Sequence, residues 1–320
     1  MTFLSTIQKP DSINYINIGL MLISLAASVV VPFEVFLFAY AILGPLHYLT
    51  EISWLHNKSY FIATKWDIGF LVAITTILTI GAIFPKAVIN QWTSALLFVS
   101  FIFPLFLFTV KKIRQKFLIF FLLFFFFGIS GLGKVLGLKI FLLVFLPTLI
   151  HVYVFTGLFI LAGFIKTKSL SSILSLIVFV LCGVSVFLFD FDFRFISDFS
   201  KQTYQPYTVL NISMLNLFGS PNFMNIENVY NSNLGFMCMR FIAFAYLYHY
   251  LNWFSKTSVI KWHEISQKRT LGIVFLWLLS ISLYIYDYKV GFIALYFLSM
   301  LHVLLEFPLN FITIKLFYRS

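Results

Sequence analysis

The sequence is poor in charge. Only 10% of its 320 residues are Asp, Glu, Lys or Arg, whereas soluble globular proteins have roughly a quarter. Acidic residues are scarcer than basic ones, with 11 Asp and Glu against 22 Lys and Arg. Hydrophobic residues make up 61% of the chain, and 43 of them are Phe. Apolar runs of about 20 residues, long enough to cross a bilayer, recur along its whole length. This composition excludes an ordinary soluble domain and predicts an all-α, polytopic integral membrane helical bundle.

Cysteine is nearly absent. Cys182 and Cys238 lie in separate apolar runs without CxxC spacing, which excludes a disulfide framework and a cysteine metal site. The chain also has no phosphate-binding glycine loop after a strand and no covalent haem motif. These absences do not exclude a haem that is bound by two histidines from different helices. The first segment is polar before its apolar run and has no small-residue cleavage site, so we expect the first helix to be retained.

Hydropathy predicts about ten transmembrane helices, the first two joined by a tight turn at Val31-Pro32. The Gly-rich stretch after the fifth predicts a re-entrant turn or a broken helix. The predicted spans are 13–31, 33–55, 67–85, 92–110, 116–130, 140–165, 169–189, 234–254, 270–287 and 290–313.

The net charge of +11 comes from bases in short loops, a pattern that the positive-inside rule explains better than nucleic-acid binding. With the N-terminus inside, 15 of the 22 bases fall on the cytoplasmic side, so both termini are predicted to be cytoplasmic. We expect an integral protein of the bacterial inner (cytoplasmic) membrane. No nucleic acid is expected as a partner.

The domain prediction is one transmembrane domain over residues 1–320, with an extracytoplasmic loop at 190–233. That loop is rich in Asn, Ser, Asp and Tyr, and its length favours a functional segment or a cap with some structure of its own. The basic loop from Lys256 to Arg269 is assigned to the cytoplasm, where it favours contact with anionic membrane lipids.

Rare ionisable residues inside the apolar runs mark the candidate site. His47 and Glu51 are four residues apart, as are His302 and Glu306, so each pair shares one helical face. His151 and His249 also lie in apolar runs. Counted at about 1.5 Å per residue from the cytoplasmic ends of their spans, all six fall between the interface and the midplane region. Random placement of polar residues would not favour one layer.

Imidazole and carboxylate groups are ligands of iron, zinc and manganese, and helical bundles build such sites from inward-facing side chains. We therefore interpret His47, His249 and His302 as metal ligands, with Glu51 and Glu306 as ligands, catalytic groups or orienting groups. His151 would be a further ligand or a catalytic proton relay. The alternative is structural, because an intramembrane histidine can simply hydrogen-bond a neighbouring helix. His56 and His263 lie near loop boundaries, and we interpret them as anchors at the membrane–water interface.

The segment Gly44-Pro45-Leu46-His47-Tyr48-Leu49-Thr50-Glu51 resembles the Gly-x-x-His-x-x-x-acid element of the Brp/Blh family of integral-membrane β-carotene 15,15'-dioxygenases. Ala245-Tyr246-Leu247-Tyr248-His249-Tyr250 is similar to the aromatic-flanked histidine in a late helix of that family. The resemblance implies a polytopic enzyme with histidine-bound iron that splits a polyene to make retinal, with His47 and His249 on the iron. Tyr48 and Glu51 stand where the family favours Gly and Asp, and its His-Phe-Gly-type element has no clear counterpart.

Three hypotheses follow. The first is a metal-dependent membrane oxidoreductase, a non-haem iron oxygenase acting on a lipid-soluble, carotenoid- or lipid-like substrate; zinc, as in a hydrolase or a lipid-modifying enzyme, is the alternative metal. The second is a proton-coupled transporter that uses the same His and Glu groups as a relay, although the chain shows no evident inverted repeat. The third is a non-catalytic subunit of a membrane complex. The sequence does not specify the substrate, the number of metals or the oligomeric state.

Overall fold

The computed structural model describes residues 10–59, 64, 66–84, 86, 92–129, 140–219 and 225–317. Helices form nearly all of this part of the chain, and no strand occurs in it. Eight of its helices are long and apolar enough to cross a membrane, and a shorter apolar helix spans Ala95–Pro104. The all-α fold is confirmed, and the apolar helices support the expected membrane protein.

Each of the ten predicted spans contains helix. Two of these helices, α6 and α7, have 17 residues each; at 1.5 Å per residue they reach about 25 Å, less than the ~30 Å of a hydrocarbon core. The number of spans and the side of the termini therefore stay predictions.

Outside the segment 190–233, the helices in chain order are α2 (Pro10–Val30), α3 (Pro32–Phe38), η1 (Ala39–Leu43), α4 (Gly44–Asn57), α5 (Trp66–Ile83), α6 (Thr93–Thr109), α7 (Ile113–Ile129), η5 (Phe141–Phe155), α9 (Thr156–Thr167), α10 (Leu170–Leu188), α14 (Asn233–Ser255), α15 (Thr257–Ile260), α16 (Gln267–Tyr286) and α17 (Tyr288–Phe317).

The chain divides into two compact units. Of the described residues, the first unit comprises those within 10–47 and 149–281, and the second comprises those within 48–148 and 282–317. The division falls inside helix α4, which continues without a break from His47 to Tyr48. Each unit is therefore built from segments that lie far apart in the sequence.

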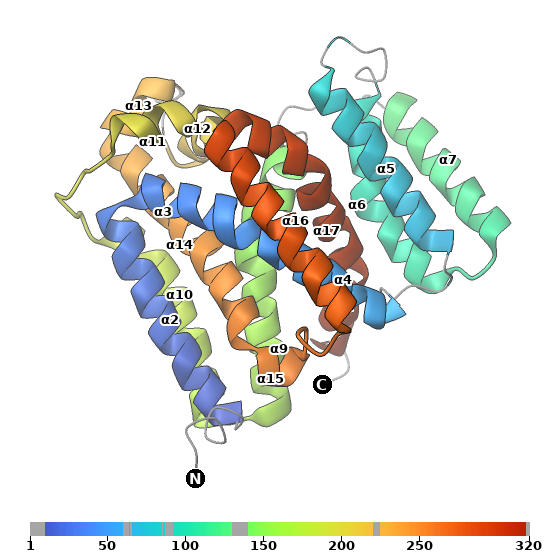
Figure 1. The fold of residues 1–320 in the computed structure, drawn as a ribbon, viewed down its shortest axis with the longest axis horizontal. Coiled ribbons are helices and arrows are strands. Elements are labelled where there is room, and N and C mark those ends of the chain that lie inside the picture. Colours follow the sequence, from blue (N-terminus) through green and yellow to red (C-terminus); the bar gives the residue numbers. More distant parts are fainter. Residues whose placement is uncertain are drawn as a thin grey trace. The chain divides into compact units, whose positions relative to one another are not determined.

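In the first unit, α2 packs against α10 and α14, and α9 packs against α10 (Figure 1). The core of this packing includes Met21, Phe179 and Phe244. Glycine permits a close approach at one point: a Cβ on Gly183 would lie 2.1 Å from the hydroxyl oxygen of Tyr153. The apolar faces of these helices are thus buried against one another, as amphipathic packing requires.

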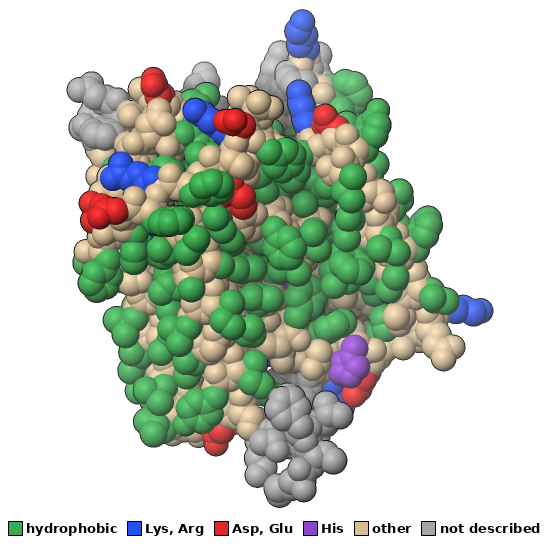
Figure 2. Space-filling model, turned by 60° about the vertical axis from the view of Figure 1, so that its left-hand side comes forward, with side chains coloured by type: hydrophobic (Ala, Val, Ile, Leu, Met, Phe, Trp, Pro, Cys, Tyr) green, Lys and Arg blue, Asp and Glu red, His purple; other side chains and the backbone are tan. Residues whose placement is uncertain are grey.

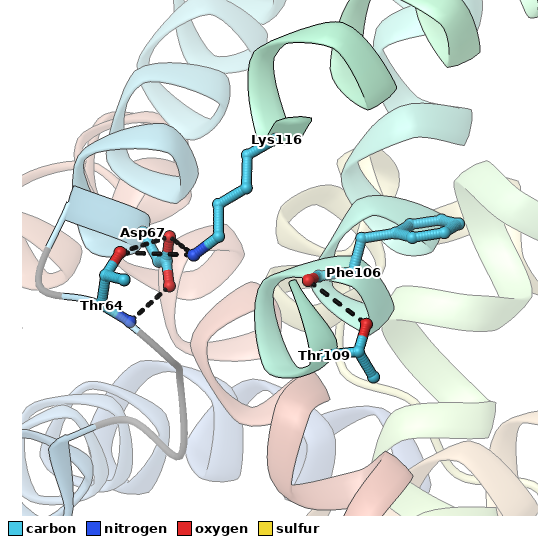
Figure 3. A network of polar contacts seen from close by, with 5 residues as sticks. All are labelled: Thr64, Asp67, Phe106, Thr109 and Lys116. Atoms are coloured by element: carbon cyan, nitrogen blue, oxygen red, sulfur yellow. Dashed lines mark hydrogen bonds and ion pairs between the residues drawn. The ribbon is translucent and has the colours of Figure 1, made fainter. Parts of the chain in front are cut away.

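The second unit contains α5, α6, α7 and α17. Helix α17 packs against α5 and α6, and α6 packs against α7. A buried ion pair links α5 and α7, because Lys116 Nζ donates to Asp67 Oδ1 and both side chains are fully shielded from solvent (Figure 3). Asp67 also accepts from the backbone N–H and the hydroxyl of Thr64, at 2.8 and 2.9 Å. These bonds satisfy charges that would otherwise be costly to bury.

The predicted loop at 190–233 contains four short helices: α11 (Asp198–Thr203), η6 (Gln205–Tyr207), α12 (Thr208–Phe218) and α13 (Ile226–Asn231). Glu34 of α3 accepts from the backbone N–H of Ser197 at 2.8 Å. Tyr204 packs edge-on against Phe33 and donates to Asn211 Oδ1 at 2.6 Å. Burial raises the pKa of Tyr204 well above its usual value. The segment is therefore a folded cap with its own buried groups.

On the face drawn in Figure 2, hydrophobic side chains cover a wide area and charged side chains are few. Exposed apolar side chains also include Phe121, Leu122, Phe125 and Phe126 of helix α7, which is in keeping with a lipid-facing surface wherever they lie on the molecule. Most of the predicted re-entrant Gly-rich stretch, from 130 to 139, lies outside the described residues.

Candidate metal centre

The helix that carries His47 changes register just before it. Pro32 opens α3, and the five residues of η1 form a π-helical turn in which the Gly44 N–H bonds to Ala39 O. Pro45 follows this turn; it has no N–H to donate, and its ring crowds the carbonyl four residues earlier. The Ile42 carbonyl in η1 accepts from Trp277 Nε1 at 2.8 Å. Such π turns inside α-helices are frequent at functional sites.

Helix α4 presents a buried polar face. His47, Thr50 and Glu51 lie at positions i, i+3 and i+4, and each is at most 3% exposed. Three polar side chains buried together on one helix are costly unless they meet partners. Their alignment makes α4 the central element of the site.

Three histidines lie together in the first unit. His47 Nε2 and His249 Nε2, of α14, are 3.1 Å apart. The ring of His151 packs edge-on against that of His249, with centroids 5.2 Å apart. His151 lies in η5, a second π-helical segment, which contains Pro147. Two of the three histidines thus follow or lie within π-helix.

Thr156 determines which ring nitrogen atoms of His249 and His47 carry a proton. Its hydroxyl has one proton, which it donates to Val152 O at 2.8 Å. The same oxygen lies 2.9 Å from His249 Nδ1, so it accepts the Nδ1–H of His249. In the neutral ring, His249 Nε2 then carries a lone pair and accepts from His47 Nε2–H. His47 consequently keeps its lone pair on Nδ1, the atom that can bind a metal ion.

The second unit gathers the carboxylates. Glu51 and Glu306 are both buried and close enough to interact electrostatically. His302 lies one turn before Glu306 on α17, and its ring stacks on Tyr48 with centroids 4.1 Å apart. Two buried carboxylates that act on each other electrostatically favour a cation or a shared proton. This corner of the second unit is therefore suited to hold positive charge.

His47, Glu51 and His302 form a buried group in which each residue offers one ligand atom, and these atoms all lie within 4.8 Å of one another. Helix α4 fixes His47 relative to Glu51, and the second unit contains both Glu51 and His302. Neutral imidazole and carboxylate are suitable donors for iron or zinc. The residue types and their spacing fit a metal ion.

The aromatic residues around His249 divide into two sets. Tyr250 and Trp253 pack against the ring of His47, with centroids 5.2 and 5.4 Å away. Tyr248 instead donates to Asn17 Oδ1 of α2 at 3.2 Å, and its hydroxyl is 3.5 Å from Asn252 Oδ1. The first set shields the histidine cluster from water, whereas the second joins α14 to α2.

One residue of the site was not identified from the sequence. Thr156 hydrogen-bonds His249, but threonine in an apolar run usually bonds only its own helix. A further buried polar residue, Asn310, lies on α17 four residues beyond Glu306, and its side-chain amide has no hydrogen-bond partner among the described residues. The i, i+4, i+8 spacing of His302, Glu306 and Asn310 places all three on one helical face. His56 and His263, read as interfacial, are exposed.

Comparison of the chain with protein-family models, with curated proteins and with solved structures gave no match.

Proposed function

We propose that this protein is a membrane-embedded, metal-dependent enzyme whose metal ion is bound by His47, Glu51 and His302. The observation that supports this most directly is the buried group of two imidazoles and one carboxylate with ligand atoms within 4.8 Å of one another. Three protein ligands leave coordination positions open for a small molecule or a substrate, as catalytic sites require.

Iron(II) is the metal we propose. Two histidines and one carboxylate with open positions are the ligand set of non-haem iron oxygenases. The resemblance of the segment from Gly44 to Glu51 to an iron-dependent membrane family points the same way. Iron would supply O₂ activation at this site. Zinc accepts the same donors, and with zinc the enzyme would be a hydrolase or another lipid-modifying enzyme.

The surroundings favour a lipid-soluble substrate. His47 and His302 are at most 3% exposed and lie in helices long and apolar enough to cross a membrane. The rings of Tyr48, Tyr250 and Trp253 pack against them. An apolar, carotenoid- or lipid-like molecule can enter such surroundings without losing hydrogen bonds to water, and water is kept from the reacting atoms.

The neighbouring residues have distinct roles in this proposal. His249 accepts the Nε2–H of His47 and so orients that ligand, as partners of ligating histidines commonly do. Glu306, which is buried and interacts electrostatically with Glu51, would hold a proton or act as a further ligand. His151, packed on His249, is a candidate proton relay.

The test is metal content. Protein purified in mild detergent from iron- and zinc-supplemented cells is measured by mass spectrometry as wild type, His302→Ala and Glu51→Gln. We expect about one equivalent of iron in the wild type. Each of the two variants should lose most of this iron. His56→Ala and His263→Ala, which replace exposed histidines, serve as controls and should keep the metal.

Oxygen consumption with carotenoids and lipids then tests the reaction. Bound zinc in place of iron would redirect the assay to lipid hydrolysis. Wild-type protein that folds but contains no metal, or His302→Ala protein that keeps it, would contradict the proposal.

A further inference from the structure

Besides the three histidines, the first unit buries an arginine on a different helix from His47. Arg240 lies on α14, seven residues after its first residue, Asn233. Its side chain is completely buried. A guanidinium group keeps its proton in proteins, so this is a permanent positive charge inside a membrane-spanning helix.

The groups that bond to Arg240 are all neutral. Its Nε donates to Val29 O at 3.3 Å, and its Nη2 donates to Phe191 O at 3.1 Å and to Phe193 O. The rings of Phe191 and Phe236 pack near the guanidinium, with centroids 5.2 and 5.8 Å from Cζ. The remaining nitrogen, Nη1, is buried and has no hydrogen-bond partner among the residues that the structure describes.

No carboxylate offsets this charge at hydrogen-bond distance in the part of the chain that the structure describes. Asp190 and Arg194 act on Arg240 from further away, with opposite signs. Buried charges in proteins are normally paired, so a bound anion would supply the partner that Arg240 lacks at hydrogen-bond distance.

We propose that Arg240 binds an oxyanion, a phosphate or a carboxylate, through Nη1. The planar guanidinium fork suits both groups, which accept paired N–H bonds. Arg194 supplies a second cation nearby, and the partly buried ring of Phe191 lies over the guanidinium at the edge of the site. Because Arg240 lies near one end of its span, the headgroup of an anionic lipid is in reach as the source. Free phosphate is the other source of the same chemistry.

The experiment is a thermal unfolding measurement on the full chain in detergent. Three additions are compared: phosphatidylglycerol, phosphatidylcholine and inorganic phosphate. We expect phosphatidylglycerol to raise the midpoint by roughly 5 °C at a hundredfold excess over its Kd, and phosphatidylcholine to have little effect. A rise of the same size with inorganic phosphate would identify free phosphate as the ligand.

The variants locate the effect. Arg240→Gln should abolish the rise, and Arg240→Lys, which keeps the charge without the fork, should keep a smaller one. Arg114→Gln removes an exposed arginine at the start of α7 and is the matched control, which should respond like the wild type. If Arg240→Gln does not fold, Arg194→Gln gives the same test and should reduce the rise. Equal stabilisation by both lipids with no effect of phosphate, or a full rise in Arg240→Lys and Arg194→Gln, would overturn the proposal.

Discussion

The hydroxyl of Thr156 can be removed with little change in shape by Thr156→Val. We assign this hydroxyl as the acceptor of His249 Nδ1–H, because its own proton goes to Val152 O, and that bond then sets the protons of His249 and His47. Without it, His249 either buries an unsatisfied N–H or moves its proton to Nε2. In the second case Nε2–H faces His47 Nε2 at 3.1 Å, and His47 has to move its own proton to Nδ1, where the metal would bind.

The expected cost follows from these two outcomes. A buried donor left without a partner costs about 1–3 kcal/mol. Loss of the group that orients a ligating histidine typically weakens metal binding by about 10- to 100-fold. We therefore expect the metal Kd of Thr156→Val to rise by about 10- to 100-fold while the fold is retained. The assay is competition with a calibrated chelator on detergent-purified protein.

Two further variants make the result specific. Thr156→Ser keeps a hydroxyl and should retain most of the affinity. Thr75→Val removes a buried hydroxyl of α5 that donates to Leu71 O at 2.7 Å, and should leave the Kd unchanged. If Thr156→Val binds metal as tightly as Thr75→Val, the proton order that we assign to the histidine cluster is wrong.

Two other predictions concern stability. Lys116→Met leaves the carboxylate of Asp67 buried without its cation and should lower the free energy of unfolding, measured with denaturant, by about 3–5 kcal/mol. The double variant Lys116→Met/Asp67→Asn should recover part of this loss. Equal losses in the single and the double variant would argue against the ion pair. Gly183→Ala places a methyl group 2.1 Å from a tyrosine hydroxyl and should cost about 1–3 kcal/mol. Gly163→Ala, whose Cβ meets nothing within 4 Å, is the control, and similar thermal midpoints for the two glycine variants would contradict the close packing.

Much of the fold could be predicted from the sequence because a membrane span needs a continuous apolar run, and such runs are visible without any alignment. The predicted span 169–189 corresponds to α10, which begins after Ser169, whose side chain accepts from the Ser172 N–H as an N-cap. The two π-helical segments could not be predicted in the same way. A π turn inserts one residue into a helix whose apolar composition does not change, so only Pro45 and Pro147 hint at it.

The candidate site was less predictable. Spacing placed His47 and Glu51 on one face, but which helices neighbour that face depends on side-chain packing between segments far apart in the chain. The contact of His249 with His47 and the approach of Glu306 to Glu51 needed the structure. Thr156 was not identified because its hydrogen bond to the carbonyl of Val152, four residues earlier, is common for threonine in apolar helices. Only its second hydrogen bond, with His249, distinguishes it from other threonines.

The order of the site residues along the chain has a consequence for biosynthesis. Glu51 and Glu306 are separated by about 250 residues. At 5–20 residues per second, the ribosome takes roughly 13–50 s to make that stretch. During this time the polar face of α4 is already in or near the bilayer, while α17 does not yet exist. A nascent chain released before residue 302 would carry His47 and Glu51 on α4 without the groups of α17 that complete the site.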